Sequence, residues 1–254
     1  MNYTLITGAS SGIGYELAIR FAKNGHNLIL VARQENKLVQ LADGLRKTYK
    51  IETLVVPLDL SDCNIAEKFL KLVNEKTISV NYLVNNAGFY IKGTFHNTSW
   101  EEEQKLIQLQ CLNHTQLTKL FLPDMLKRGK GGILNVGSTG SFVPGPYNVI
   151  YCAAKSFVLS FSEALAEEVS AFGVTVTALC PGGTYTAFQD FSKRRKSIFF
   201  PTMEASRVAE IGYNALMKGK RVVIPGMANK IQVFLMRFVP RNLTTKLTGL
   251  MVAK

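Results

Sequence analysis

Short apolar runs alternate with longer segments of helical periodicity along most of the chain. The runs are rich in aliphatic and β-branched residues, which is typical of buried strands. Between them, apolar residues recur three and four positions apart, which is typical of helices with one face against a core. The expected strands are residues 3–7, 27–32, 52–58, 81–85, 132–136, 174–179 and 222–224, and the expected helices are residues 15–23, 34–49, 62–76, 100–127, with a break at Pro123, and 150–172.

This alternation predicts an α/β fold, a Rossmann-type doubly wound parallel sheet of about seven strands with helices on both faces. The 254 residues are 47% hydrophobic and contain no repeat or linker, so we expect one domain over residues 1–254. A C-terminal helical extension is expected over residues 227–254. It consists of a mostly apolar helix, residues 229–239, and a short amphipathic helix after Pro240.

A glycine-rich turn follows the first strand and opens the first helix. Its glycines let the backbone approach a pyrophosphate, and the amino end of the helix favours negative charge. The spacing differs from GxGxxG, so the interpretation depends on the position after the first strand. The turn predicts a dinucleotide site formed by Gly8, Ser10, Ser11, Gly12, Ile13 and Gly14.

The second expected strand ends in Ala32-Arg33, with no carboxylate to bind a ribose 2′-hydroxyl. A guanidinium at this place suits a 2′-phosphate, because it pairs with phosphate through directed hydrogen bonds. The alternative is an ordinary surface arginine. The sequence therefore favours NADP(H) over NAD(H).

Candidate acid–base chemistry lies after the fifth expected strand. Ser138 follows that strand, and Tyr151 and Lys155 lie one helical turn apart in the next helix. A phenol beside an ammonium is an acid–base pair, because the positive charge lowers the tyrosine pKa from about 10. The alternative is a chance pair of a packed tyrosine and a solvated lysine. Asn113 lies within an expected helix, as a mild defect or as part of a water-mediated network.

Taken together, these motifs resemble the short-chain dehydrogenase/reductase family, of the NADP(H)-preferring type, over residues 2–225. The resemblance rests on motifs in the family's order: Thr7–Gly14, Asp59, Asn85–Gly88, Asn113, Ser138, Tyr151-x-x-x-Lys155 and Pro181-Gly182. It implies a Rossmann-type fold, adenine contacts near Asp59 and Leu60, and ribose contacts from Tyr151 and Lys155. The other implied cofactor contacts are Asn86, Ala87, Gly88, Pro181, Gly182, Thr184, which stands where the family commonly has valine, and Thr186.

The resemblance also implies catalytic roles for a tetrad. Tyr151 would be the general acid in reduction and the base in oxidation, and Ser138 would hydrogen-bond the substrate oxygen. Lys155 would lower the Tyr151 pKa and bind ribose hydroxyls, while Asn113 would hold a relay water. No metal site is expected, and the four scattered cysteines indicate reduced thiols.

The expected substrate loop is residues 184–206. Four phenylalanines give it apolar bulk, and residues 193–196 are all basic. One interpretation is an amphipathic lid whose basic face is solvated, and the alternative is a pocket for an apolar substrate with an anionic end. Such a substrate would be an acyl thioester of a phosphorylated carrier.

The whole chain has a formal net charge of +12, and most of this charge lies in its last quarter. Residues 1–189 hold 17 Lys and Arg against 15 Asp and Glu, whereas residues 190–254 hold 13 against 3. This segregation disfavours a nucleic-acid partner. A weak, salt-sensitive contact of the tail with an anionic membrane remains an alternative to packing on a partner subunit.

The sequence therefore predicts an NADP(H)-dependent oxidoreductase that acts on a carbonyl or secondary alcohol of an apolar substrate. The alternatives are a 3-oxoacyl-thioester reductase and a catalytically silent nucleotide-binding scaffold or sensor. The resemblance implies a homodimer or homotetramer. Because a strand begins at Asn2, with no targeting segment before it, a cytoplasmic location is expected.

Overall fold

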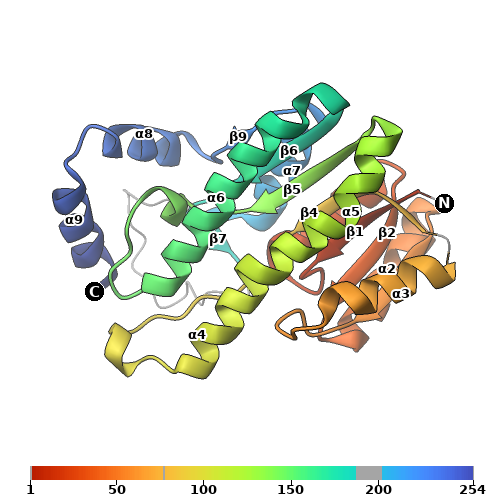
Figure 1. The fold of residues 1–254 in the computed structure, drawn as a ribbon, viewed down its shortest axis with the longest axis horizontal. Coiled ribbons are helices and arrows are strands. Elements are labelled where there is room, and N and C mark those ends of the chain that lie inside the picture. Colours follow the sequence, from red (N-terminus) through yellow and green to blue (C-terminus); the bar gives the residue numbers. More distant parts are fainter. Residues whose placement is uncertain (1, 77, 187–201, 254) are drawn as a thin grey trace.

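A parallel sheet organises the computed structural model, which describes residues 2–76, 78–186 and 202–253. Its seven strands follow the order β3-β2-β1-β4-β5-β6-β9, and every neighbouring pair is parallel (Figure 1). The strands are β1 (Asn2–Thr7), β2 (Asn27–Ala32), β3 (Thr53–Pro57), β4 (Ser79–Asn85), β5 (Gly131–Val136), β6 (Val174–Leu179) and β9 (Val222–Val223). The predicted doubly wound fold is confirmed.

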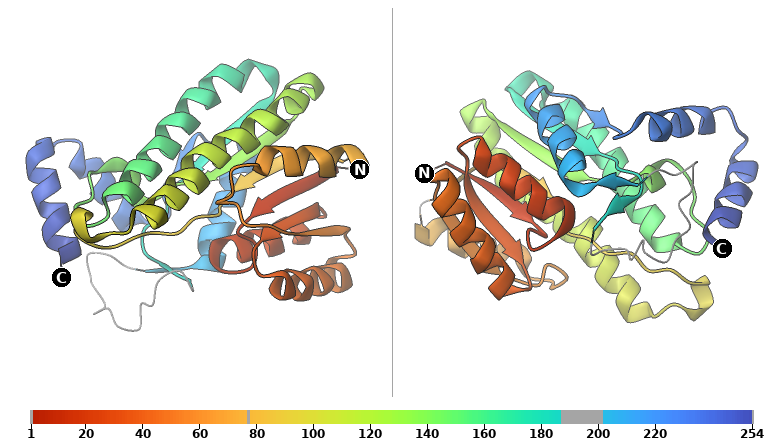
Figure 2. Two further views of the ribbon diagram at one scale, coloured as in Figure 1. Left: turned by 60° about the horizontal axis from the view of Figure 1, so that its bottom comes forward. Right: turned by 180° about the vertical axis from the view of Figure 1, so that it is seen from behind.

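Helices cover both faces of the sheet (Figure 2). On one face lie α1 (Gly12–Lys23), α2 (Glu35–Tyr49) and α7 (Ala205–Met217), and on the other lie α3 (Ile65–Lys76), α5 (His114–Arg128) and α6 (Val149–Val169). Each face has its own apolar core, built around Phe21 on the first and Phe69 on the second. The sheet is therefore buried on both sides, as apolar runs in parallel strands require.

The long helix predicted over residues 100–127 is divided differently from the prediction. α4 (Trp100–Ile107) leads into a π-helical turn, Gln108–Asn113, and α5 follows without interruption. Pro123 lies inside α5 and does not end it, so the predicted break is wrong. Phe121 and Met125, on either side of the proline, are buried against the sheet, and this packing holds the helix where the missing N–H weakens it.

Several described elements were absent from the predictions, and three of them frame the expected substrate loop. These are α7 and two very short parallel strands, β7 (Thr184–Tyr185) and β8 (Met203–Glu204). Most of the expected substrate loop falls between these strands. Its aromatic and basic residues lie outside the described part of the chain: Phe188, Phe191, Lys193, Arg194, Arg195, Lys196, Phe199 and Phe200.

The C-terminal extension extends beyond the sheet as two helices, α8 (Met227–Met236) and α9 (Arg241–Ala253), on the side where α6 begins (Figure 1). α8 contacts the short helical turn η3 (Thr139–Phe142) after β5. α9 lies against the loop before α6, where a Cβ added to Gly249 would be 3.3 Å from Pro146 Cγ. Both helices are therefore neighbours of the segments that carry Ser138 and Tyr151.

Candidate active site

The carboxyl ends of the parallel strands meet at one edge of the sheet. β1 lies between β2 and β4, so the chain winds in opposite directions from this point, and ligands of such sheets bind in the crevice that results. The predicted residues follow the strands that end here: the glycine turn after β1, Arg33 after β2, Asp59 and Leu60 after β3, residues 86–88 after β4, Ser138 after β5, and Pro181 and Gly182 after β6.

The glycine turn is a cradle that side chains would fill. Gly8 and Gly12 have φ angles of +67° and +57°, a region that favours glycine. A Cβ on Gly14 would lie 2.3 Å from the Gly8 carbonyl oxygen, and one on Gly12 would lie 3.0 Å from Thr186 Cγ2. The turn therefore requires glycine, and the free N–H groups at the start of α1 are of the kind that bind a phosphate. Thr186 lies beside Gly12, and its contact with the cofactor stays a prediction.

A second segment is locked beside the cradle by Thr7. Thr7 Oγ1 donates to the Val84 carbonyl (3.1 Å) and accepts from the backbone N–H groups of Asn86 (2.9 Å) and Ala87 (3.0 Å). In return, Asn86 Nδ2 donates to the Thr7 carbonyl at 2.9 Å. The ends of β1 and β4 are thus fixed to each other, a structural role for Thr7 and Asn86 that the sequence did not reveal.

Arg33 and Asp59 lie together at the ends of β2 and β3. Arg33 Nη1 is 3.8 Å from Asp59 Oδ2, and the Arg33 side chain is 77% exposed. Burial raises the pKa of Asp59, but hydrogen bonds from the backbone and side chain of Ser61, and the Arg33 charge, outweigh it and leave the pKa below its ordinary value. Asp59 is therefore ionised at neutral pH, and it forms a loose, solvent-exposed ion pair with Arg33.

The acid–base residues meet as their spacing predicted. The Ser138 side chain lies beside Tyr151, and Lys155 Nζ lies 5.8 Å from the centre of the Tyr151 ring. Lys155 Nζ donates to the Val136 carbonyl at 2.7 Å, so the end of β5 positions it. The Tyr90 ring packs edge-on against Tyr151 with 5.9 Å between ring centres.

Burial controls the ionisation of this group. It raises the pKa of Tyr151 to about 12, although the hydrogen bond from Ser138 opposes the shift. Burial also lowers the pKa of Lys155 to about 8. The pKa of Tyr151 in the free protein is therefore shifted upward, opposite to the predicted depression, because loss of hydration outweighs the effect of Ser138.

Asn113 closes the π-helical turn, with its side chain fully occupied. Nδ2 donates to the carbonyls of Leu60 (2.6 Å) and Asp62 (2.8 Å), and Oδ1 accepts from Gln108 Nε2 (2.8 Å). The amide thus fixes the loop after β3 to the turn. The relay water that the family resemblance implied at Asn113 stays a prediction.

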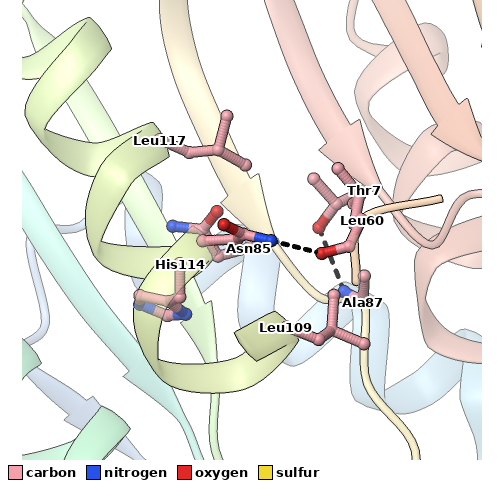
Figure 3. A pocket seen from close by; sticks show the side chains of 8 residues that line it. Thr7, Leu60, Asn85, Ala87, Leu109, His114 and Leu117 are labelled. Carbon is pink, nitrogen blue, oxygen red and sulfur yellow. Dashed lines mark hydrogen bonds between the residues drawn. The ribbon is translucent and has the colours of Figure 1, made fainter. Parts of the chain in front are cut away.

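A water-sized cavity of about 10 Å³ lies beside Asn113, between the ends of β1 and β4, the loop after β3 and α5 (Figure 3). The His114 imidazole lines it, and its Nε2 has no hydrogen-bond partner in the described structure. Burial, and secondarily the Lys155 charge, lower the His114 pKa to about 3, so the ring is neutral. The sequence did not mark His114 as a site residue.

A buried polar ladder lies behind the site. Asn85 Nδ2 donates to Asn135 Oδ1 (3.1 Å), and Asn135 Nδ2 donates to Ser162 Oγ (2.9 Å). It joins β4, β5 and α6, the elements on either side of the acid–base group. An asparagine within the otherwise apolar strand β5 was the signal that could have revealed it, since a buried amide needs partners.

The turn after β6 is tied to two neighbours. The Pro181 carbonyl accepts from Thr139 N at 2.9 Å, and Thr184 Oγ1 donates to the Gly182 carbonyl at 3.1 Å. A Cβ on Gly182 would lie 2.6 Å from side-chain atoms of Asn229 in α8. The cofactor side of the crevice is thus in contact with the C-terminal extension.

Comparison with known proteins identifies this arrangement. The family described as short chain dehydrogenase matches residues 2–197. The chain belongs to that family. Proteins of this family bind a nicotinamide cofactor, and the family resemblance found in the sequence is confirmed, whereas the preference for NADP(H) stays a prediction.

Relatives and solved structures agree with this assignment. A very-long-chain 3-oxoacyl-CoA reductase of Aspergillus terreus is 32% identical over 84% of this chain and 62% of its own length. The dehydrogenase/reductase SDR family member 7 of Homo sapiens is 37% identical over 70% and 53%. A solved structure of a 7beta-hydroxysteroid dehydrogenase shares the fold with a TM-score of 0.90 and 25% identity, over 98% of this chain and 96% of that one. A solved structure of a Sphingobium yanoikuyae short-chain dehydrogenase with NADPH shares it with a TM-score of 0.80 and 30% identity, over 95% of this chain and 97% of that one.

The predicted cytoplasmic location is wrong. The chain spans little more than half of these relatives' length, so its first strand says nothing about segments beyond it. The reductase relatives are named for very-long-chain substrates, and such chains favour lipid by about 0.8 kcal/mol per buried methylene.

Among the described residues, one stretch, Val149–Phe172, is long and apolar enough to cross a membrane. It includes α6, which packs on β6 and carries Tyr151 and Lys155. Core helices of soluble proteins meet the same criterion of length and apolarity. This stretch is therefore weak evidence for a membrane span.

Proposed function

We propose that the protein is an NADPH-dependent reductase of 3-oxoacyl thioesters with an apolar acyl chain. The observation that carries the proposal is the meeting of Ser138, Tyr151 and Lys155 at the end of β5, with Lys155 Nζ 5.8 Å from the centre of the Tyr151 ring. The names of several relatives favour a 3-oxoacyl thioester over a simple ketone or secondary alcohol.

The residues at the strand ends fit a nicotinamide dinucleotide, because the Gly8–Gly14 cradle has room only for backbone. In our proposal the cradle and Thr186 hold the pyrophosphate, Asp59 and Leu60 flank the adenine, and residues 86–88 and Lys155 contact the ribose. Pro181, Gly182 and Thr184 border the nicotinamide. The bound cofactor supplies the hydride, and the protein binds, orients and polarises.

The proton comes from Tyr151. Its raised pKa keeps the phenol protonated at neutral pH, so it is ready to act as an acid when negative charge develops on the substrate oxygen. Ser138 donates a hydrogen bond to the same oxygen, and the ammonium of Lys155 stabilises the phenolate that remains. Reprotonation proceeds past Lys155 toward the Asn113 turn.

For cofactor choice, we propose NADPH over NADH. Arg33 lies at the end of β2 with no carboxylate on its own strand, and its side chain is 77% exposed and so accessible to a phosphate. Arg33→Ala should weaken NADPH binding at least tenfold and leave NADH within about twofold, since one charge-assisted phosphate contact is worth about 1.5–3 kcal/mol. Equal losses for both cofactors would contradict the assignment, and Arg46→Ala, another exposed arginine, is the control.

The partners that we propose are a small carbonyl substrate, a second or further copies of the chain in a homodimer or homotetramer, and an anionic membrane surface reached through the basic tail. The family commonly forms oligomers. The size of the assembly is measured directly by sedimentation.

The decisive experiment is Tyr151→Phe, with Tyr49→Phe at the far end of α2 as the matched control. Turnover of a 3-oxoacyl-CoA should fall at least a thousandfold in the first variant, at the upper part of the range for general acid catalysis, while NADPH binding stays within about twofold. Near-normal turnover in Tyr151→Phe would overturn the mechanism.

A substrate panel separates the remaining alternatives. Rates that rise with acyl length across 3-oxoacyl-CoA esters, and exceed those of ketones lacking the thioester, support the proposal. Faster turnover of simple apolar ketones would favour the broader carbonyl reductase. Tight NADPH binding with no turnover of any carbonyl would favour the nucleotide sensor.

A further inference from the structure

The two C-terminal helices expose apolar side chains that no described residue covers. Seven large ones, 48–72% exposed, form what we call the tail face: Met227, Ile231, Phe234, Leu235, Phe238, Leu243 and Leu250. The first five recur at helical spacing along α8 and its end, so they share one side of that helix. A patch of this kind marks an interaction site.

The same helices carry only positive charge. Residues 227–254 contain five Lys and Arg and no Asp or Glu. Lys230, Arg237, Arg241 and Lys246 are exposed, and none of them takes part in an ion pair among the described residues. The tail face is thus an apolar stripe edged by uncompensated cations.

Charge decides between two occupants of this face. In a two-fold symmetric dimer the same patch would face itself, and each cation would meet cations of the other copy with no carboxylate between them. A bilayer with anionic headgroups offers both an apolar layer and compensating charge. The nearly neutral first 189 residues show that the positive charge is local to this end of the chain.

The tail face also adjoins the candidate active site. Asn229, on the buried side of α8, packs against Gly182, and α9 packs against Pro146 in the loop that leads to Tyr151. Figure 1 shows both helices on the side where α6 begins. Docking of this face on a membrane would therefore bring the candidate active site close to the lipid.

We infer that α8 and α9 dock on an anionic bilayer surface through the tail face and present the active site to apolar acyl substrates in that bilayer. The docking itself stands on exposure and charge alone. The delivery of substrate rests on the proposed function.

The docking test measures partition of the full-length protein between buffer and vesicles that contain no substrate. Phe234→Ser with Phe238→Ser should lower partition onto phosphatidylglycerol vesicles at least about tenfold. The matched control is Phe95→Ser with Phe172→Ser, two phenylalanines of similar exposure outside the tail face, and it should stay within about twofold. Partition should also be weak on phosphatidylcholine vesicles and should fall with added salt.

Three results would overturn docking: equal partition of the tail variant and the wild type, no preference for anionic vesicles, or a lower oligomeric mass in the tail variant, which would assign the face to a second copy. Turnover of a short, soluble 3-oxoacyl-CoA in buffer should be unchanged in the tail variant, whereas turnover of a long-chain substrate in vesicles should fall with partition. If the wild type partitions onto anionic vesicles as expected but turns over neither 3-oxoacyl-CoA substrate, the proposed function is refuted and the docking still stands.

Discussion

At the level of single residues, the cofactor side of the site requires glycines at positions where any side chain would collide with neighbouring atoms. Gly14 is the most constrained, since its Cβ would meet the Gly8 carbonyl at 2.3 Å, and a backbone atom cannot move aside as a flexible side chain can. Arg33 lies 3.8 Å from Asp59, which the sequence had marked only for adenine contact. The constraints on Gly14 and Arg33 thus come from residues that are close in space but not adjacent in sequence.

Gly14→Ala should abolish detectable NADPH binding, because the cradle must open to admit the methyl group. Gly44→Ala is the matched control, as a Cβ there meets nothing within 4 Å. Gly44 is inside α2, so its replacement should leave binding unchanged and stabilise the fold by about 0.5–1 kcal/mol. Titration of NADPH fluorescence and thermal unfolding measure both effects, and normal binding by Gly14→Ala would contradict the assigned cradle.

Lys155 makes NADPH binding depend on pH. Its native pKa of about 8 lies below the ordinary value of 10.5, so the free protein loses the ammonium as pH rises through about 8. If ribose hydroxyls bind the charged form, affinity is constant below this pH and falls by up to about tenfold per unit above it. Lys155→Met should bind more weakly at all pH values and show no such decline, and a parallel decline in that variant would exclude Lys155 as its cause.

At the level of elements, the end of β5 connects the catalytic group to the core. It supplies the carbonyl that holds Lys155, and the same strand carries Asn135 in the buried ladder between β4 and α6. The ladder fixes the distance between these elements with directional bonds that apolar packing alone would not provide.

Asn135→Ala should lower the free energy of unfolding by about 2–3 kcal/mol, because it leaves a cavity and removes partners from Asn85 and Ser162. Asn97→Ala, at an exposed asparagine bonded only to nearby Thr94, should cost less than about 1 kcal/mol. Urea unfolding measures both losses of unfolding free energy, provided that the dependence of this free energy on urea concentration is the same in the variants and the wild type. Equal costs would mean that the ladder contributes nothing beyond an ordinary surface hydrogen bond.

The sequence predicted most elements because buried strands and one-sided helices leave clear periodicities. The strand over Val174–Leu179 matches its predicted limits, and the spacing of Val208, Leu216 and their neighbours could also have predicted α7. The π-helical turn has the same apolar pattern as an α-helix, so its hydrogen bonding was not predictable. The Tyr151 pKa depends on burial by distant segments, which spacing within α6 does not reveal.

At the level of the whole molecule, one continuous sheet separates two apolar cores. The strands that line both cores are the same, so neither face can unfold without exposing the other. The crevice, the acid–base group and the tail face all depend on this common framework. A single domain over the whole chain, as predicted, would therefore unfold cooperatively.

We expect a single thermal transition, coincident by far-ultraviolet and near-ultraviolet circular dichroism, since the two cores share one sheet. A cofactor that binds only the native state should raise this transition as a whole, with about 2.7 kcal/mol of stabilisation at a hundred times its dissociation constant. Deletion of residues 227–254 removes helices outside the two cores, so the shortened chain should keep a single transition. Two separate transitions, or a cofactor-induced shift in only one signal, would show that the chain contains independent units.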